Sequence, residues 1–133
     1  MEVGVNSEAS PEQVTSFTQA ATGELPVIMR LPMERSLELA ALAIQAGATA
    51  ISLAPPRGVY PTQDGAMIQG RLYGPAVLPV ALKTVQELVK LGIPTIAAGG
   101  VYSQEHCHAL LTAGALAVQV DGTLWRSVGY KVL

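Results

Sequence analysis

The sequence predicts an α/β fold built around a parallel sheet, because one strand–helix–strand pattern occurs in it twice. Residues 25–53 and residues 93–120 each read as an apolar strand, a helix, an Ala-Gly-Ala turn and a second apolar strand. The two copies keep nearly the same spacing, 68 positions between the opening prolines and 67 between the turn glycines (Pro26 to Pro94, Gly47 to Gly114). The strands are continuous apolar runs, as in parallel sheets covered on both faces. Such repeats build parallel sheets and β/α barrels.

The first half of the chain is expected to supply three strands and two helices. Residues 2–6 read as a short strand. A helix begins at Pro11, because Ser10 can cap its first turn and Gln13 can reach back to the cap, and Gly23 is expected to end it. Residues 26–31 and 48–53 read as strands. The helix between them, over residues 33–46, has an expected apolar stripe of Leu37, Ala40, Ala41 and Ile44.

The second half is expected to supply two strands and two helices after a long irregular segment. Residues 54–74 contain three prolines and four glycines, so no regular element is expected there. A segment of this length in a compact domain is usually functional or mobile. Residues 75–91 read as a helix and residues 94–98 as a strand. Ser103 then caps a helix that ends at Gly114, and residues 116–120 form the last strand.

Composition excludes several classes of function. The 133 residues are enough for one domain, and 50% hydrophobic residues with 14% charged residues exclude disorder. A net charge of −2 without a basic run gives no reason to expect nucleic acid or an anionic membrane surface as a partner. The apolar stretches are too short to cross a membrane.

The chain has one cysteine, Cys107, which forbids an internal disulfide and suits a reducing cytoplasm, the location that we expect. His106 and His108 flank this cysteine. Residues two positions apart point to different faces of a helix, so these side chains do not predict a metal site.

The ligand site of a parallel β/α fold lies beyond the carboxyl ends of its strands. The residues expected at these positions are Arg30, Ala54-Pro55, Gly99-Gly100 and Asp121-Gly122-Thr123, and the long segment over residues 54–74 is expected to overhang them. The paired glycines let a backbone approach a ligand closely, and the helix capped by Ser103 would aim free N–H groups at the same place. These features are typical of a phosphate cradle. The alternative is that the glycines only serve tight turns.

Three runs in the second half resemble the C-terminal half of the dihydroorotate dehydrogenases, which are flavin-dependent (β/α)8 barrels. They are Gly70-Arg71-Leu72-Tyr73-Gly74-Pro75-Ala76, Ile93 to Val101, and Ala117 to Thr123. Residues 25–32 resemble the strand that carries the flavin-contacting lysine of that family. The resemblance implies one domain over residues 1–133, a partial (β/α)8 barrel of about five parallel strands with four helices that lacks the first three strands.

The resemblance also implies a cofactor and the residues that hold it. FMN would place its phosphate on the backbone of Gly99, Gly100, Gly122 and Thr123, and Gly74 would lie along the ribityl chain or the phosphate. Arg30 would replace the lysine that faces the isoalloxazine ring, a swap that changes shape as well as hydrogen bonding. The other interpretation of Arg30 is a surface arginine at a strand end.

The chain departs from the family where the chemistry is expected. Ala54-Pro55 stands where the family has Asn-Thr, Tyr73 replaces a serine, and Asp121 is one residue more than the family has before its Gly-Thr. The segment that carries the catalytic base is not recognisable. Ser7 falls near the position of that base and is a weak candidate for it, with a loop serine as the alternative.

The sequence therefore leaves alternative functions open. The first is a dihydroorotate dehydrogenase-like oxidoreductase that uses FMN to oxidise a dihydropyrimidine. The second is a phosphate- or nucleotide-binding module without catalysis, and the third is a purely structural half-barrel. Five strands leave sheet edges unpaired, so we expect a homo-oligomer or assembly with a chain that supplies the complementing half of the barrel.

Overall fold

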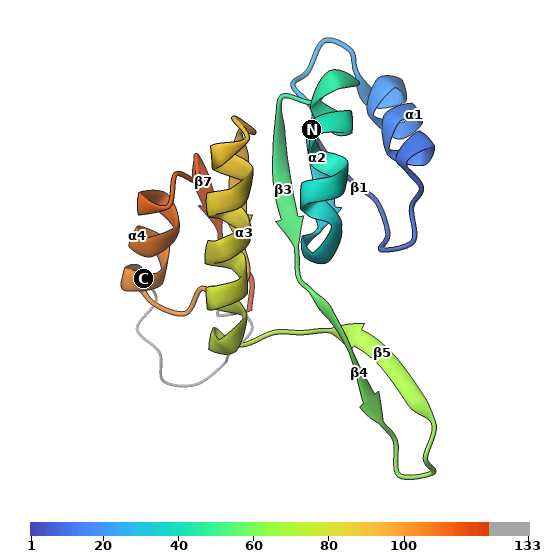
Figure 1. The fold of residues 1–133 in the computed structure, drawn as a ribbon, viewed down its shortest axis with the longest axis vertical. Helices are drawn as coiled ribbons and strands as arrows, with labels where there is room; N and C mark the ends of the chain where they lie inside the picture. The colour runs from blue at the N-terminus through green and yellow to red at the C-terminus, as the bar shows by residue number, and fades with distance from the viewer. Residues whose placement is uncertain (123–133) are drawn as a thin grey trace.

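A computed structural model describes residues 1–122, and its centre is a five-stranded parallel sheet in the order β1-β2-β3-β6-β7 (Figure 1). The strands are β1 (Glu2–Gly4), β2 (Ile28–Pro32), β3 (Ala50–Ala54), β6 (Thr95–Ala98) and β7 (Ala117–Gln119). The helices are α1 (Pro11–Ala21), α2 (Ser36–Gln45), α3 (Leu78–Lys90) and α4 (Gln104–Thr112). Short 3₁₀ turns, η1 (Met33–Arg35) and η2 (Pro75–Val77), precede α2 and α3. The predicted α/β class, five parallel strands and four helices are confirmed.

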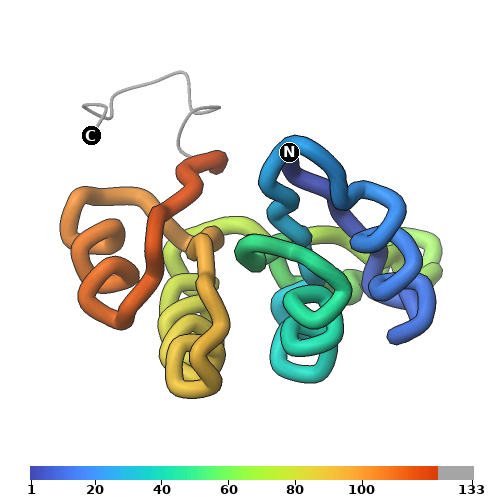
Figure 2. Tube along the Cα trace, turned by 90° about the horizontal axis from the view of Figure 1, so that it is seen from above, coloured from blue at the N-terminus to red at the C-terminus, as the bar shows by residue number. Residues whose placement is uncertain are grey.

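The sheet has one covered and one open face. All four helices lie on the same side of it (Figure 2). The side chains that alternate toward this side are fully buried and form the core with the helices (Met29, Leu31, Ile51, Leu53 and Ala97). The residues between them point to the other face, where no described helix packs. In a closed β/α barrel this second face is the inside of the barrel.

The start of α1 follows the prediction. Ser10 Oγ accepts a hydrogen bond from the Gln13 N–H at 3.2 Å, and Gln13 Oε1 accepts one from the Ser10 N–H at 2.9 Å. This reciprocal capping box satisfies two donors that the first turn leaves without helical partners. The helix ends at Ala21, two residues before Gly23, the expected stop.

The segment between β3 and α3 contradicts the prediction of no regular element. It contains an antiparallel hairpin, β4 (Arg57–Pro61) and β5 (Met67–Arg71), which extends away from the sheet (Figure 1). The glycines that argued against a strand are accommodated in it. Gly58 pairs with Gly70, and a Cβ on Gly58 would come within 2.9 Å of Leu72 Cδ2. The hairpin closes through Asp64-Gly65, a dipeptide that favours tight turns.

The predicted apolar stripe of α2 is wrong in part. Its buried residues are Ser36, Leu39, Ala40 and Ala43, while Leu37 is 42% exposed. Apolar residues lie all around this helix, so periodicity could not select its buried face. Among residues 1–122, no helix has the length and hydropathy needed to cross a membrane.

Candidate functional site

A pocket lies at the carboxyl ends of β2, β3, β6 and β7, where the parallel sheet was expected to bind a ligand. It brings together five of the six residues that the resemblance implied for FMN, namely Arg30, Gly74, Gly99, Gly100 and Gly122. The sixth, Thr123, lies outside the described residues. We call this site the glycine pocket. Its cavity of about 40 Å³ holds roughly three waters, which suits a group of phosphate size.

The turn after β6 shapes the floor of this pocket. Gly99 and Gly100 have φ angles of +105° and +73°, values that favour glycine. A Cβ on Gly100 would lie 2.2 Å from the backbone nitrogen of Leu78, so this glycine also lets the turn pack against α3. The N–H groups of both glycines lack a backbone acceptor among the described residues. Buried N–H groups normally have a partner, so these donors suit an anion.

The start of α4 was expected to aim free N–H groups at the ligand site, and it does not. Ser103 does cap the helix, because its Oγ accepts a hydrogen bond from the His106 N–H at 3.3 Å. His106 Nδ1 in turn accepts one from the Tyr102 N–H at 3.1 Å. Neither Ser103 nor Gln104 lines the glycine pocket. The N-terminus of α4 is therefore closed by its own side chains and does not point into the pocket.

Two side chains restrict the far wall of the pocket. Tyr102 and Asp121 both line it, and a Cβ on Gly122 would come within 2.9 Å of Tyr102 Oη. The Asp121 carboxylate would repel a phosphate there. The base of the hairpin forms the opposite wall through Leu72, Tyr73 and Gly74, while the hairpin itself extends away. The expectation that this segment overhangs the site therefore applies only to its last residues.

A polar network on the open face of the sheet was missed by sequence reasoning. Ser52 Oγ donates a hydrogen bond of 2.5 Å to Glu2 Oε1, and Gln119 Nε2 donates one of 3.1 Å to the same oxygen. Burial raises the pKa of Glu2, but these two hydrogen bonds and the charge of Arg30 outweigh it, so the pKa lies below its usual value. The signal in the sequence that could have indicated this network was a polar residue within each of three predicted strands.

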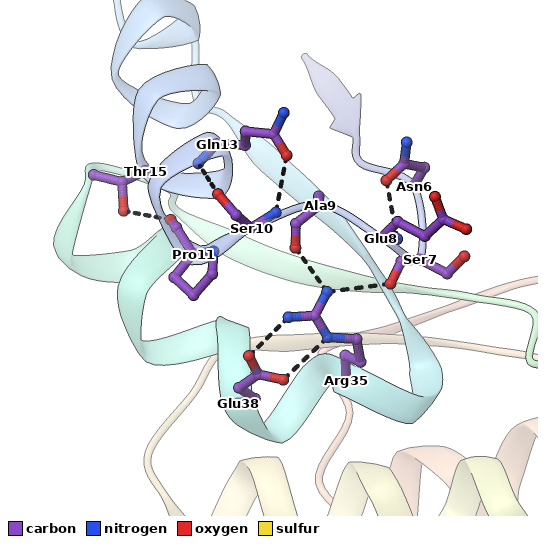
Figure 3. A network of polar contacts seen from close by, with 10 residues as sticks. All are labelled: Asn6, Ser7, Glu8, Ala9, Ser10, Pro11, Gln13, Thr15, Arg35 and Glu38. Atoms are coloured by element: carbon purple, nitrogen blue, oxygen red, sulfur yellow. Dashed lines mark hydrogen bonds and ion pairs between the residues drawn. The ribbon is translucent and has the colours of Figure 1, made fainter.

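Ser7, the weak candidate for the catalytic base, does not reach the glycine pocket. It lines a separate surface groove together with Glu34 and Arg57. Its carbonyl accepts a hydrogen bond of 3.1 Å from Arg35 Nη1, which also donates one of 2.7 Å to the Ala9 carbonyl (Figure 3). The base candidate that the sequence offered is therefore not at the glycine pocket.

Arg35 belongs to a contact that joins two segments far apart in the sequence. Its Nε and Nη2 pair with both carboxylate oxygens of Glu38, at 3.0 and 2.7 Å (Figure 3). The remaining guanidinium nitrogen, Nη1, holds the loop after β1 through the carbonyls of Ser7 and Ala9. Within residues 1–122, no three His, Cys, Asp or Glu side chains come close enough together to hold a metal ion.

Comparison with known proteins shows which sequences the chain is similar to. It is 36% identical to the catalytic subunit of dihydroorotate dehydrogenase B (NAD(+)) from Methanopyrus kandleri, over 88% of this chain and 42% of that protein. The corresponding subunit from Methanocella arvoryzae is 31% identical over 95% of this chain and 46% of its own length. The protein is a partial dihydroorotate dehydrogenase-like chain. It spans somewhat under half the length of these curated relatives, and no family model matches it.

Solved structures confirm the fold of this dihydroorotate dehydrogenase-like chain. Dihydroorotate dehydrogenase from Eimeria tenella, in complex with ferulenol, superposes with a TM-score of 0.67 at 16% identity, covering 86% of this chain and 40% of the other. A GMP reductase from Trypanosoma brucei gives a TM-score of 0.56 at 20% identity, over 90% of this chain and 25% of the other. Similarity at these identities concerns the fold alone. It agrees with a partial β/α barrel.

Proposed function

We propose that this chain is the cofactor-binding part of an FMN-dependent, dihydroorotate dehydrogenase-like oxidoreductase that oxidises a dihydropyrimidine. The observation that carries the proposal is the glycine pocket, which gathers residues from four strand ends and the hairpin base at the expected edge of the sheet. The curated relatives, which are named as catalytic subunits of dihydroorotate dehydrogenase B, support the reaction class.

The pocket fits the phosphate end of FMN. Gly99 and Gly100 offer N–H donors without backbone acceptors among the described residues, and the enclosed volume suits a phosphate. Gly122 keeps the opposite wall free of a side chain that would meet Tyr102. Asp121 opposes the phosphate charge, so binding depends on the backbone donors outweighing one carboxylate. Thr123, outside the described residues, would add a hydroxyl.

Arg30 would orient the rest of the cofactor. It is half-buried at the third of the five residues of β2 and lines the pocket beside Pro55, on the open face of the sheet. A guanidinium there attracts negative charge and offers donors in a fixed plane, so it would hold the flavin ring over the strand ends. FMN, when bound, supplies the two-electron acceptor.

A second candidate function is ligand binding without catalysis. It is a phosphate- or nucleotide-binding half-barrel that assembles with a partner chain. The position of Ser7, in a groove apart from the glycine pocket, favours this alternative because the residue that the sequence offered as the catalytic base is not at the pocket. Under either function we propose one domain over residues 1–133, a cytoplasmic location, and a partner that covers the open face of the sheet.

Titration with FMN and riboflavin tests the phosphate site, because the two flavins differ only by the phosphate. We expect the full chain to bind FMN at least tenfold more tightly than riboflavin, measured by quenching of flavin fluorescence. Inorganic phosphate should compete with FMN. Equal binding of the two flavins would exclude a phosphate cradle. Loss of flavin absorbance on anaerobic addition of dihydroorotate would then separate the oxidoreductase from the binding module.

A further inference from the structure

The β4–β5 hairpin extends from the body of the protein as a two-stranded ribbon of its own (Figure 1). All of its strand residues are exposed except Gly58, which is half-buried. Four large apolar side chains of the ribbon are each more than half exposed (Val59, Tyr60, Met67 and Ile68). A two-stranded ribbon is at best marginally stable in water and gains stability from a further strand. The hairpin is therefore a candidate interaction surface.

Hydrogen bonds at the two ends of the hairpin fix which of its backbone groups point outward. The Thr62 N–H donates to the Ala66 carbonyl at 2.7 Å, and the Leu72 N–H donates to the Pro56 carbonyl at 2.8 Å. Bonded and non-bonded pairs alternate along an antiparallel ladder. The even-numbered residues between these ends are therefore bonded across the hairpin, and the odd-numbered residues of both strands point their N–H and C=O groups outward.

The outward edge of β5 is complete, whereas that of β4 is not. On β5, Met67, Gln69 and Arg71 each present both an N–H and a C=O outward. Within residues 1–122, no group outside the hairpin makes a hydrogen bond to these backbone groups. One of the three corresponding residues on β4 is Pro61, which has no N–H. The edge that can accept a further strand along its whole length is therefore that of β5.

We propose that β5 pairs antiparallel with β5 of a second copy of this chain, so that the two hairpins form one four-stranded sheet around a twofold axis at Gln69. A twofold contact uses the same surface of both copies, and this edge is complementary to itself. Gln69 then faces Gln69 of the second copy, and Met67 faces Arg71. Each facing pair exchanges two backbone hydrogen bonds. This contact leaves the open face of the five-stranded sheet to other partners and does not depend on flavin binding.

Charge and shape favour a second copy as the occupant of this edge. When two hairpins lie side by side in opposite directions, the tip of each reaches the base of the other, and the tip carries Asp64 while the base carries Arg57 and Arg71. Tyr60 and Ile68 of one copy share a row with the two paired glycines of the other, which leave room for these large side chains. An axis at Arg71 instead would oppose two like charges, which is destabilising.

Light scattering and hydrogen exchange on the full chain, over a series of protein concentrations, test this proposal. The mass should rise with concentration from 13.8 kDa toward twice that value. The amides of Met67, Gln69 and Arg71 should exchange more slowly as the dimer forms, because the second copy then accepts their hydrogen bonds. The amide of Val59 should stay fast at every concentration, since its N–H lies on the other edge of the hairpin.

Gln69→Pro and Val59→Pro are matched variants of the two edges. The two residues face each other across the hairpin, and each points its N–H outward, so a proline at either position removes no hydrogen bond within the hairpin. Gln69→Pro removes one N–H donor from each copy at the twofold axis and should weaken dimerisation at least about tenfold. Val59→Pro should leave dimerisation unchanged, and it controls for any effect of proline on the hairpin itself.

Three results would overturn the proposal. The first is a chain that stays monomeric at every concentration. The second is a dimer in which the amides of Met67, Gln69 and Arg71 exchange as fast as that of Val59, because the copies would then meet at another surface. The third is an equal loss of dimerisation in Gln69→Pro and Val59→Pro. Slow exchange along β5 that appears only with the dimer, together with a selective effect of Gln69→Pro, would establish the contact.

Discussion

Substitution of Gly100 by alanine tests whether the turn after β6 requires a close approach of two backbones. Gly100 has a φ angle of +73°, and a Cβ there would lie 2.2 Å from Leu78 N and 2.7 Å from Leu78 Cα. Both atoms belong to the backbone at the start of α3, which is packed in the core and cannot move as a flexible side chain would. The turn or the helix must therefore shift.

Two separate costs make up the expected effect. An alanine at a left-handed φ costs about 1–2 kcal/mol relative to glycine. Forcing extra volume into a packed site adds about 1–3 kcal/mol. The sum is about 2–5 kcal/mol. For a chain of 133 residues, each kcal/mol corresponds to roughly 3–4 °C in melting temperature. We therefore expect Gly100→Ala to melt about 6–20 °C below the wild type.

Gly92 provides a matched control, because it has the same φ angle of +73° and a Cβ added to it would meet no heavy atom within 4 Å. Gly92→Ala should show only the backbone cost, about 1–2 kcal/mol. Gly23 has neither a positive φ nor a close neighbour, so Gly23→Ala should be neutral or slightly stabilising. Chemical denaturation of the three variants, followed by circular dichroism, gives the free energies of unfolding.

The difference between Gly100→Ala and Gly92→Ala isolates the contact with Leu78. If the two variants lose the same free energy of unfolding, the close approach does not exist in solution and the shape inferred for the glycine pocket is wrong. If Gly100→Ala is the less stable by about 1 kcal/mol or more, the low end of the overpacking cost, the contact is real.

Two further predictions concern polar contacts. Arg35→Met should release the loop after β1, so hydrogen exchange of the amides at residues 6–9 should become several-fold faster with little change in melting temperature. Glu38→Gln removes only an exposed ion pair and should have a much smaller effect on this exchange. Equal effects of the two variants would contradict this account. The pKa of Glu2 is lowered on folding, so its charge stabilises the fold above the usual pKa of 4.5 and ceases to do so as the pH falls below the folded value. The stability difference between wild type and Glu2→Gln should therefore shrink from pH 6 to pH 3.5 in urea denaturation, and a constant difference would refute this role.

The strands of the sheet and the position of the pocket could be predicted from the sequence. Continuous apolar runs and glycine stops marked the strands and helices, and strand ends in a parallel sheet must meet at one edge. This is why Arg30, Gly99 and Gly122, distant in the chain, line one pocket. The hairpin was missed because its glycines and prolines were counted as breakers. The Asp64-Gly65 turn was the signal in its favour.

The network on the open face could not be predicted, because it depends on which strands are neighbours. Glu2 and Gln119 belong to the first and last strands of the sheet, 117 positions apart. The Glu2 carboxylate can meet both Ser52, in the middle strand, and Gln119, in the last strand, only because the sheet curves and the open face is its inner side. Nothing in the local sequence of either strand specifies that contact.

This curvature also bears on what covers the open face. The sheet supplies five strands, and a barrel of eight needs three more, whereas a second copy of this chain would bring five and make ten. The inner face is also partly polar, since Glu2, Arg30 and Gln119 lie on it beside apolar residues. A covering element must therefore provide polar partners as well as apolar surface, because an unpaired buried charge is strongly destabilising. Three complementary strand–helix units meet both requirements better than a second copy, whose own inner face would bring the same charges.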